Sequence, residues 1–318
     1  MDYAPLAAAA DLLWENPLVS EPARRAESQA RLLCDLAAPW RTRRQLERLE
    51  SPSRSQAETF RFGVLGDAEP GRFWLFRKLF NRPGVFESHV RRIQGDGCDF
   101  TMQLGDMVSC GTPENYVSFF EDLSAWGVET PYLTTIGNHD RRYPHGVTDS
   151  DTYRSCFGPV NYAFDRGGWR FVSVDSSAHR VTGPQLRWLD RVLDTTLRTV
   201  VFTHIPPAVL REWPHYRGAR GVGGFRRGAE EFTDILSRRR VERVYLGHIH
   251  AFGVQDFKGV RYVLTGGGGS PLFPCGVEDR FHHYLVVEAG PDGLRETIRS
   301  ADGRDLAIPR AAVVLSRA

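Results

Sequence analysis

The chain has 318 residues, of which 41% are hydrophobic and 25% are charged, and its formal net charge is +2. This length fits one large α/β domain or a domain with an extension. A charge so close to zero argues against a nucleic-acid partner and gives no bulk attraction to a membrane surface. We therefore expect a globular protein with a sizeable core.

The five cysteines are scattered and contain no Cys-x-x-Cys pair. This pattern argues against a disulfide framework or a zinc ribbon and is typical of a reducing compartment. The opening sequence, MDYAPLAAAADLLWENP, has no basic region before its alanine-rich run, so it does not resemble a secretory signal. No apolar stretch of about 18 residues occurs. We expect no membrane span and predict a cytoplasmic location.

Residues 1–58 are rich in Ala, Leu, Arg and Glu, and they predict a helical N-terminal extension. Ser20 is an expected helix cap, and Pro22 lies in the first turn of the helix that follows it. A second helical run covers residues 39–50, and residues 51–56 form a predicted linker. These helices either pack on the main domain or dock a partner, for example in a homo-oligomer.

Residues 59–318 form the predicted main domain, in which short apolar runs alternate with helical segments. This alternation indicates an α/β domain. Predicted helices lie between the runs, one of them capped by Thr112 with Pro113 at its first position. Three predicted hairpins turn at residues 166–168, 258–259 and 290–293. Hairpins favour a mixed sheet, or two sheets packed face to face, over a purely parallel sheet.

Five of the apolar runs end in residues that can bind metals: Asp67 and Glu69, Asp106, Asn138 with His139 and Asp140, His204, and His248 with His250. Ligands of α/β sheets bind beyond the carboxyl ends of the strands, so we expect these side chains to converge. If the last strand continued, His248 and His250 would point the same way. Imidazole and carboxylate donors suit Fe, Mn, Zn, Co or Ni. The set is too large for one tetrahedral ion and suits two ions that share a carboxylate.

The blocks GDAE, GDMV, GNHD, THIPP and GHIH, in this order, resemble those of the calcineurin-like metallophosphoesterase superfamily. The resemblance implies an α/β fold: a four-layer α/β/β/α sandwich of two mixed β-sheets flanked by helices, here with the helical N-terminal extension. It implies two divalent or trivalent metal ions, Mn, Fe or Zn. It also implies hydrolysis of a small phosphorylated substrate, a phosphodiester or a phosphomonoester, by a metal-activated hydroxide.

The same resemblance implies two metal sites. Asp67 and His250 would form the first site, and Asn138, His204 and His248 the second. Asp106 would be the carboxylate that bridges the two ions. His139 is expected to lie beside the phosphate oxygens, with Asn138, and to protonate the leaving group. Asp140 is expected to support His139.

The first block departs from the usual D-x-H pattern, because Glu69 stands in place of the histidine. A carboxylate would lower the Lewis acidity of the first metal and favour Mn or Fe over Zn. We hypothesise that Glu69 ligates this metal directly or through water. In the alternative, Glu69 points away and the first site is weak. A catalytically weak metal-binding regulatory or scaffold domain then also remains open.

Residues 206–228 carry five arginines and a single acid. They form either a solvated basic loop or a mobile lip that steers an anionic substrate. In the second case Arg217 and Arg220 are the predicted substrate-binding arginines. The remaining histidines follow no pattern and are assigned to surface or structural positions: His89, His145, His179, His215, His282 and His283.

Overall fold

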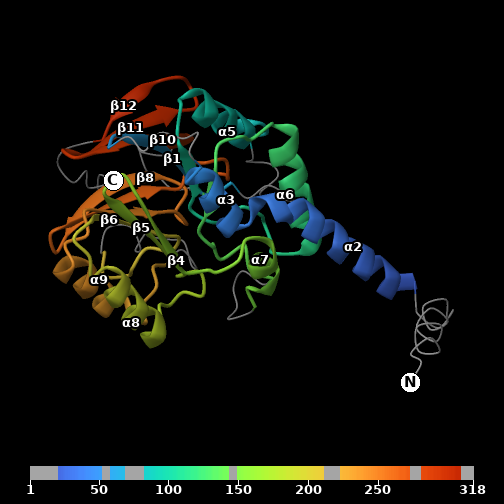
Figure 1. Cartoon of the computed structure of the whole chain (residues 1–318), viewed down its shortest axis with the longest axis horizontal. Coiled ribbons are helices and arrows are strands. Elements are labelled where there is room, and N and C mark those ends of the chain that lie inside the picture. Colours follow the sequence, from blue (N-terminus) through green and yellow to red (C-terminus); the bar gives the residue numbers. More distant parts are fainter. Residues whose placement is uncertain are drawn as a thin grey trace.

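The structure is a computed structural model of the chain, and it describes residues 21–51, 58–68, 82–142, 149–210, 223–272 and 281–308. Within these ranges twelve strands form two six-stranded sheets (Figure 1). The first sheet has the order β12-β11-β10-β1-β2-β3. Its strands are β1 (Phe60–Leu65), β2 (Phe100–Gln103), β3 (Tyr132–Thr134), β10 (His283–Gly290), β11 (Gly293–Ser300) and β12 (Asp305–Ala307). Strands β1 to β3 are parallel and β10 to β12 are antiparallel, so the sheet is mixed.

The second sheet has the order β4-β5-β6-β7-β9-β8 and is also mixed. Its strands are β4 (Tyr162–Arg166), β5 (Trp169–Val174), β6 (Arg198–Thr203), β7 (Arg243–Leu246), β8 (Phe252–Phe257) and β9 (Val260–Thr265). The three predicted hairpins are confirmed as β4–β5, β8–β9 and β10–β11. In the β8–β9 turn, Lys258 and Gly259 both have positive φ, the backbone twist that two-residue hairpins favour.

Helices cover the outer face of each sheet (Figure 1). The first sheet is covered by α2 (Glu21–Ala37), the 3₁₀ helix η1 (Ala38–Trp40), α5 (Val85–Gly95), α6 (Pro113–Ala125) and α7 (Asp151–Cys156). The second is covered by α8 (Gly183–Val192) and α9 (Ala229–Arg238). Helix α6 begins as predicted, because the Thr112 hydroxyl accepts the N–H of Asn115 and Pro113 opens the helix.

An aromatic layer joins the inner faces of the two sheets. Phe62 of β1 stacks on Phe100 of β2 at a ring-centroid distance of 5.0 Å. It also meets Phe171 of β5 edge to face at 5.4 Å. All three side chains are fully buried, and each buries about 150–250 Å² of aromatic surface that favours this packing. The four-layer sandwich of two mixed sheets flanked by helices is therefore confirmed.

The N-terminal helices pack against the main domain. Trp40 and Leu49, the last residue of α3 (Thr42–Leu49), are buried in its core. The buried Gln45 side chain accepts the N–H of Tyr132 on the edge strand β3, at 2.7 Å. This bond occupies a backbone donor that an edge strand otherwise leaves open. The predicted cap Ser20 lies outside the described residues.

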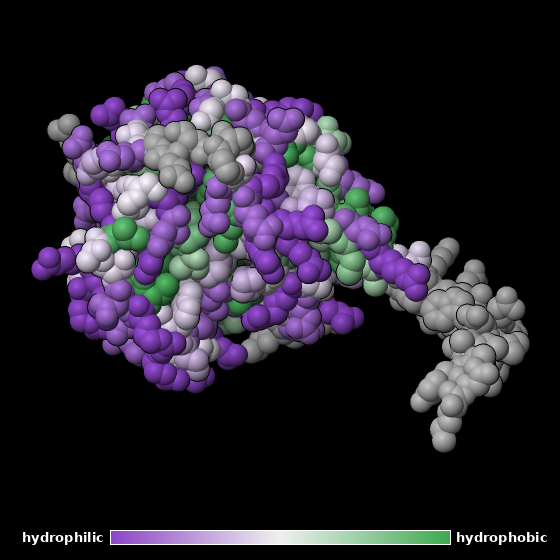
Figure 2. Space-filling model, in the orientation of Figure 1, coloured by the Kyte–Doolittle hydropathy of each residue, from purple (hydrophilic) through white to green (hydrophobic). Residues whose placement is uncertain are grey.

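Helix α2 extends beyond the body of the molecule towards the N-terminus (Figure 1). Figure 2 shows hydrophobic atoms on both sides of the place where α2 leaves the body. Leu32 of this helix is 45% exposed. The proposed homo-oligomer through these helices stays a prediction. Among the helices within the described ranges, none combines the length and the apolar character that crossing a bilayer requires.

Candidate metal centre

The strand ends bring the predicted ligands together. Strands β1, β2, β3, β6 and β7 each end one to four residues before a predicted ligand. Two groups of side chains offer ligand atoms within 4.8 Å of one another: Asp106, His204 and His248, and Asp67, Asp106 and His250. Asp106 belongs to both groups. We call the first of these groups, together with Asn138, the second-site group, and we call Asp67 with His250 the first-site group.

The second-site group is a closed cluster. Asp106 Oδ2 lies 3.2 Å from His204 Nε2. Asn138 Oδ1 lies 3.0 Å from the same nitrogen and 2.9 Å from His248 Nδ1. The Nε2 atom of His248 is buried and has no hydrogen-bond partner in the part of the chain that the structure describes. Buried polar atoms without partners are rare, so Nε2 indicates a partner that the described residues do not supply, while Nδ1 faces the other members of the group.

The first-site group joins the first and last predicted blocks. Asp67 Oδ1 accepts the backbone N–H of His248 at 2.9 Å and lies 3.5 Å from His250 Nε2. Strand β7 ends at Leu246, and His248 has a φ of +72°, so these histidines lie in a turn rather than on a strand. Strand alternation therefore does not apply to them, and the two rings fall in different groups.

Two backbone carbonyls fix the orientation of the histidine rings. His204 Nδ1 lies 2.7 Å from Leu104 O, and His250 Nδ1 lies 2.7 Å from Pro271 O. A carbonyl oxygen only accepts, so each Nδ1 donates its proton and each Nε2 lone pair faces the carboxylates. This is the arrangement in which a neutral histidine binds a metal through Nε2.

Glycines let the motif loops approach one another. A Cβ on Gly137 would lie 2.1 Å from Asp106 Oδ1, and one on Gly247 would lie 2.7 Å from Asp67 Oδ2. Both distances are shorter than any that a real Cβ atom makes. The glycines that precede Asn138 and His248 are therefore required by the packing of one motif against the next. The ligand residues Asp67 and Asp106 also have positive φ, a strain that clusters at functional sites.

The electrostatics of the buried cluster favour a bound cation. Burial raises the pKa of Asp67. Burial also opposes ionisation of Asp106, but His204 and His139 lower its pKa overall. For His204, burial acts to lower the pKa, and the Asp106 carboxylate outweighs it and raises the pKa to about 10. Such opposed shifts mark a functional-site candidate, and a divalent cation would replace the proton between the two groups. The oxygen and nitrogen donors fit Mn, Fe or Zn.

The predicted general acid His139 is half-buried beside the shared carboxylate. Its backbone N–H donates to Asp106 Oδ1 at 2.8 Å, and its Nδ1 lies 3.0 Å from Ser109 O. The Asp140 carboxylate accepts backbone N–H groups of Gly137 at 2.7 Å and Met107 at 2.9 Å. Asp140 thus fastens the loop that carries His139 to the loop that carries Asp106. Burial and the charge of Asp106 raise the pKa of Asp140 to about 7.

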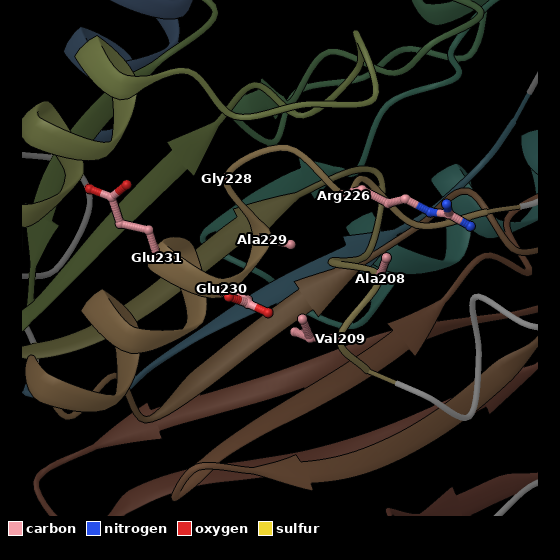
Figure 3. Close-up of a pocket in the computed structure, with 7 residues that line it drawn as sticks. All are labelled: Ala208, Val209, Arg226, Gly228, Ala229, Glu230 and Glu231. Carbon is pink, nitrogen blue, oxygen red and sulfur yellow. The ribbon is translucent and has the colours of Figure 1, made fainter.

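Three predicted site residues, Glu69, Arg217 and Arg220, lie outside the described residues, and the predictions for them stay predictions. The described ends of the basic loop flank a pocket of about 540 Å³ (Figure 3). It is lined by Ala208, Val209, Arg226, Gly228, Ala229, Glu230 and Glu231. In Figure 3, Arg226 and Glu231 point in opposite directions. Two acids at the start of α9 already complement the helix dipole, and no predicted metal ligand lines this pocket. The pocket therefore offers no predicted metal ligand, and the candidate site remains the cluster at the strand ends.

Sequence reasoning missed several supporting groups. The carbonyls of Leu104 and Pro271 carry no side-chain signal, so no motif could reveal them. Arg141 directly follows the GNHD block, and its guanidinium donates to Asp175 at 2.9 Å and to Ser177 at 2.7 Å. This buried pair ties the third block to the loop after β5. The sequence feature that could have revealed this pair is the arginine directly after the GNHD block.

Comparison with known proteins decides the family. The family model described as calcineurin-like phosphoesterase matches residues 60–252, more than half of the chain. The chain belongs to the calcineurin-like phosphoesterase family. Membership makes it a hydrolase that acts on phosphoric ester bonds, and it confirms the resemblance seen in the five blocks.

Individual members of the family show moderate similarity. A nucleotide pyrophosphatase/phosphodiesterase of Hordeum vulgare is 25% identical over 297 residues, 76% of this chain and 79% of that protein. Purple acid phosphatase 23 of Arabidopsis thaliana is 27% identical over 175 residues, 48% of this chain and 36% of that protein. The structure of a purple acid phosphatase from Lupinus luteus seeds has a TM-score of 0.60 at 16% identity. It covers 78% of this chain, which spans about half (53%) of the lupin protein, and it supports the fold alone.

Proposed function

We propose that this phosphoesterase hydrolyses its substrate with two metal ions that share Asp106. The observation that carries the proposal is that Asp106 belongs to both groups of potential ligands. A shared carboxylate is how two-metal hydrolases hold their ions about 3.5–4 Å apart. Asn138, His204 and His248 would hold one ion, and Asp67 and His250 the other.

The Lewis-acid chemistry of the reaction would come from the two bound ions. When bound, they would supply Lewis-acid charge to the phosphate oxygens and lower the pKa of an attacking water. Mn or Fe is the proposed metal, because Glu69 would add a carboxylate to the first site.

The residues of the chain would hold the ester and move the proton. His139 lies next to the shared carboxylate and would donate a proton to the leaving oxygen. Because its Nδ1 already donates to Ser109 O, the proton would leave from Nε2. Asp140 would keep the His139 loop in register with Asp106 through the backbone bonds described above. Asn138 would contact a phosphate oxygen together with His139.

Phosphodiesters are the substrate class to test first. The barley relative, which matches 76% of this chain, is named as a nucleotide pyrophosphatase/phosphodiesterase, and this name supports the choice. Phosphomonoesters are the alternative, because the Arabidopsis relative is named as a phosphatase. We also propose a cytoplasmic location, which the free cysteines Cys34, Cys98, Cys110 and Cys156 support.

Metal-dependent hydrolysis of two chromogenic esters tests the proposal. A chelator would first remove bound metals from the protein. The protein would then be loaded with Mn²⁺ and assayed on bis-p-nitrophenyl phosphate and p-nitrophenyl phosphate, with Asp106→Asn as the matched control. We expect turnover to return with the ion in the wild-type protein alone. If wild type and Asp106→Asn hydrolyse both esters equally slowly, the proposal is wrong, and ion binding without turnover would support the scaffold alternative.

A further inference from the structure

We propose that His179 is a substrate-contacting residue, which donates a hydrogen bond to a phosphate oxygen on the His248 side of the metal centre. This inference rests on the proposed function and adds a residue that none of the five motif blocks contains. His179 lies in the loop between β5 and α8, far in sequence from His248.

Three imidazole rings form a row from the core to the surface. The ring of His204 is fully buried and lies 5.2 Å from the ring of His248. The ring of His248 lies 5.6 Å from that of His179, edge to face at 79°. His179 is exposed. It is therefore the outermost ring of the row, where an ester that approaches the second-site group would meet it.

The backbone conformation of His179 is the one found at the ligands themselves. Among the described residues, positive φ at non-glycine positions occurs at Asp67, Asp106, His179, Arg240, His248 and Lys258. Two of these are ordinary turn positions, Arg240 after the end of α9 and Lys258 in the β8–β9 hairpin. The other four converge on the metal centre. His179 also closes a turn, because its amide bonds to Ser176 O as the Arg240 amide bonds to Ser237 O, so it is the place of its ring beside His248 that carries the inference.

The loop that carries His179 is held at both ends. Ser176 Oγ accepts the backbone N–H of Ile205, next to His204, at 2.8 Å. The N–H of Val181 donates to Arg227 O at 3.1 Å. The His179 amide itself donates to Ser176 O at 2.9 Å, which closes the turn. Fixed on both sides, the ring is positioned as a binding residue needs to be.

The surroundings of His179 suit an anion. Arg180 follows it directly and pairs through its backbone with Arg227. Neither arginine forms a salt bridge with any residue in the described ranges, so their charge is not neutralised there. A positive surface at this place favours a phosphate ester. An imidazole N–H then has a negatively charged oxygen as its acceptor, and hydrogen bonds to charged groups are stronger than those between neutral groups.

The test removes the ring without adding backbone strain. His179→Gly deletes the imidazole and accepts the left-handed φ. The matched control is Arg240→Gly, because Arg240 has the same φ of +53° and is exposed at the end of α9. His179→Asn tolerates this conformation and keeps an N–H donor. The measurements are kcat and KM on bis-p-nitrophenyl phosphate, affinity for inorganic phosphate by calorimetry, and metal content.

The expected result is full metal content and a loss of about 10- to 100-fold in kcat/KM for His179→Gly, mostly through KM. Phosphate affinity would fall by a similar factor, His179→Asn would lose less, and Arg240→Gly would match wild type. Unchanged kcat/KM and phosphate affinity in His179→Gly would overturn the inference, and so would loss of a metal ion. If wild type binds phosphate through His179 but hydrolyses no ester, the proposed function fails and this inference stands. If wild type does neither, both fail.

Discussion

The two halves of the candidate metal centre are built differently. In the second-site group, Asn138 contacts both His204 and His248, and His204 contacts Asp106. In the first-site group, Asp67 and His250 lie 3.5 Å apart, and the further predicted ligand, Glu69, lies outside the described residues. One half is thus a closed cluster of side chains, whereas the third predicted ligand of the other half, Glu69, departs from the family pattern. We infer that the fold preorganises the second site, and we expect this site to bind its ion more tightly than the first site does.

The backbone carbonyls that orient the histidines also differ between the two halves. His204 is oriented by Leu104 O, which follows directly on β2. His250 is oriented by Pro271 O, at the end of the glycine-rich segment 265–271. In that segment Ser270 N donates to Asp67 O, so one stretch of chain supports both first-site ligands. The first site is therefore sensitive to changes in that segment.

The largest expected effect comes from removing one ligand in each half. His204→Ala should lose the second ion and all metal-dependent turnover, because it also removes the imidazole that faces the buried Asp106 carboxylate. His250→Ala should lose only the first ion and keep the second. Metal analysis of both variants checks this. Loss of both ions from His250→Ala would contradict the expected difference between the two sites.

The next effect concerns His139, which belongs to neither half. His139→Ala should keep both ions and lose about 10²–10⁴-fold in kcat on esters with poor leaving groups. An activated aryl ester needs less protonation, so its hydrolysis should fall much less. Parallel assays on an alkyl and an aryl phosphodiester make the measurement, with metal content as the control. Equal losses on the two substrates would contradict the role as general acid.

A smaller effect is expected at Glu69. If Glu69 ligates the first ion directly or through water, Glu69→Ala should weaken first-site affinity by about 10- to 100-fold, the effect of losing a supporting partner of a metal. Glu69→His should restore affinity and shift the preference towards Zn. Competition titrations with Mn²⁺ and Zn²⁺ measure both changes. Wild-type stoichiometry and activity in both variants would show that Glu69 is no ligand.

The last effect is on stability in acid rather than on activity, and its residues line the glycine-rich segment. His89 contacts Gly268 O and His283 contacts Thr265, and burial lowers the pKa of His89 to about 3 and that of His283 to about 4. The unfolded chain takes up these protons near pH 6.5, so unfolding binds protons below that pH. The free energy of unfolding should fall, as the pH falls from about 6.5 to 4, by up to about 1.4 kcal/mol per unit for each histidine.

Urea denaturation at a series of pH values measures this slope. His89→Gln keeps a donor for Gly268 O but does not titrate, so its slope should be shallower than that of wild type. An identical slope in the variant would show that His89 does not cause the acid sensitivity.

Much of the fold and of the site could be predicted from the sequence. The five apolar runs carried the strands and, at their ends, the side chains that converge as candidate ligands, because strand ends of an α/β sheet face one rim. The hairpins were visible because their turn residues, such as Lys258–Gly259, demand positive φ.

Other features depend on contacts between distant segments. Strand β7 ends at Leu246, so His248 and His250 lie in the turn after it, which the local pattern did not show. His179 follows no motif and gains its place only when the β5–α8 loop folds over His248. The orienting carbonyls of Leu104 and Pro271 are equally invisible, because every residue has one.

The most direct test of the central claim is a crystal structure of the Mn²⁺-loaded protein with anomalous scattering recorded at the manganese edge. We expect two peaks about 3.5–4 Å apart, both within bonding distance of Asp106, one of them beside Asn138 and His204 and the other beside Asp67 and His250. A single peak, or two peaks of which only one contacts Asp106, would contradict it.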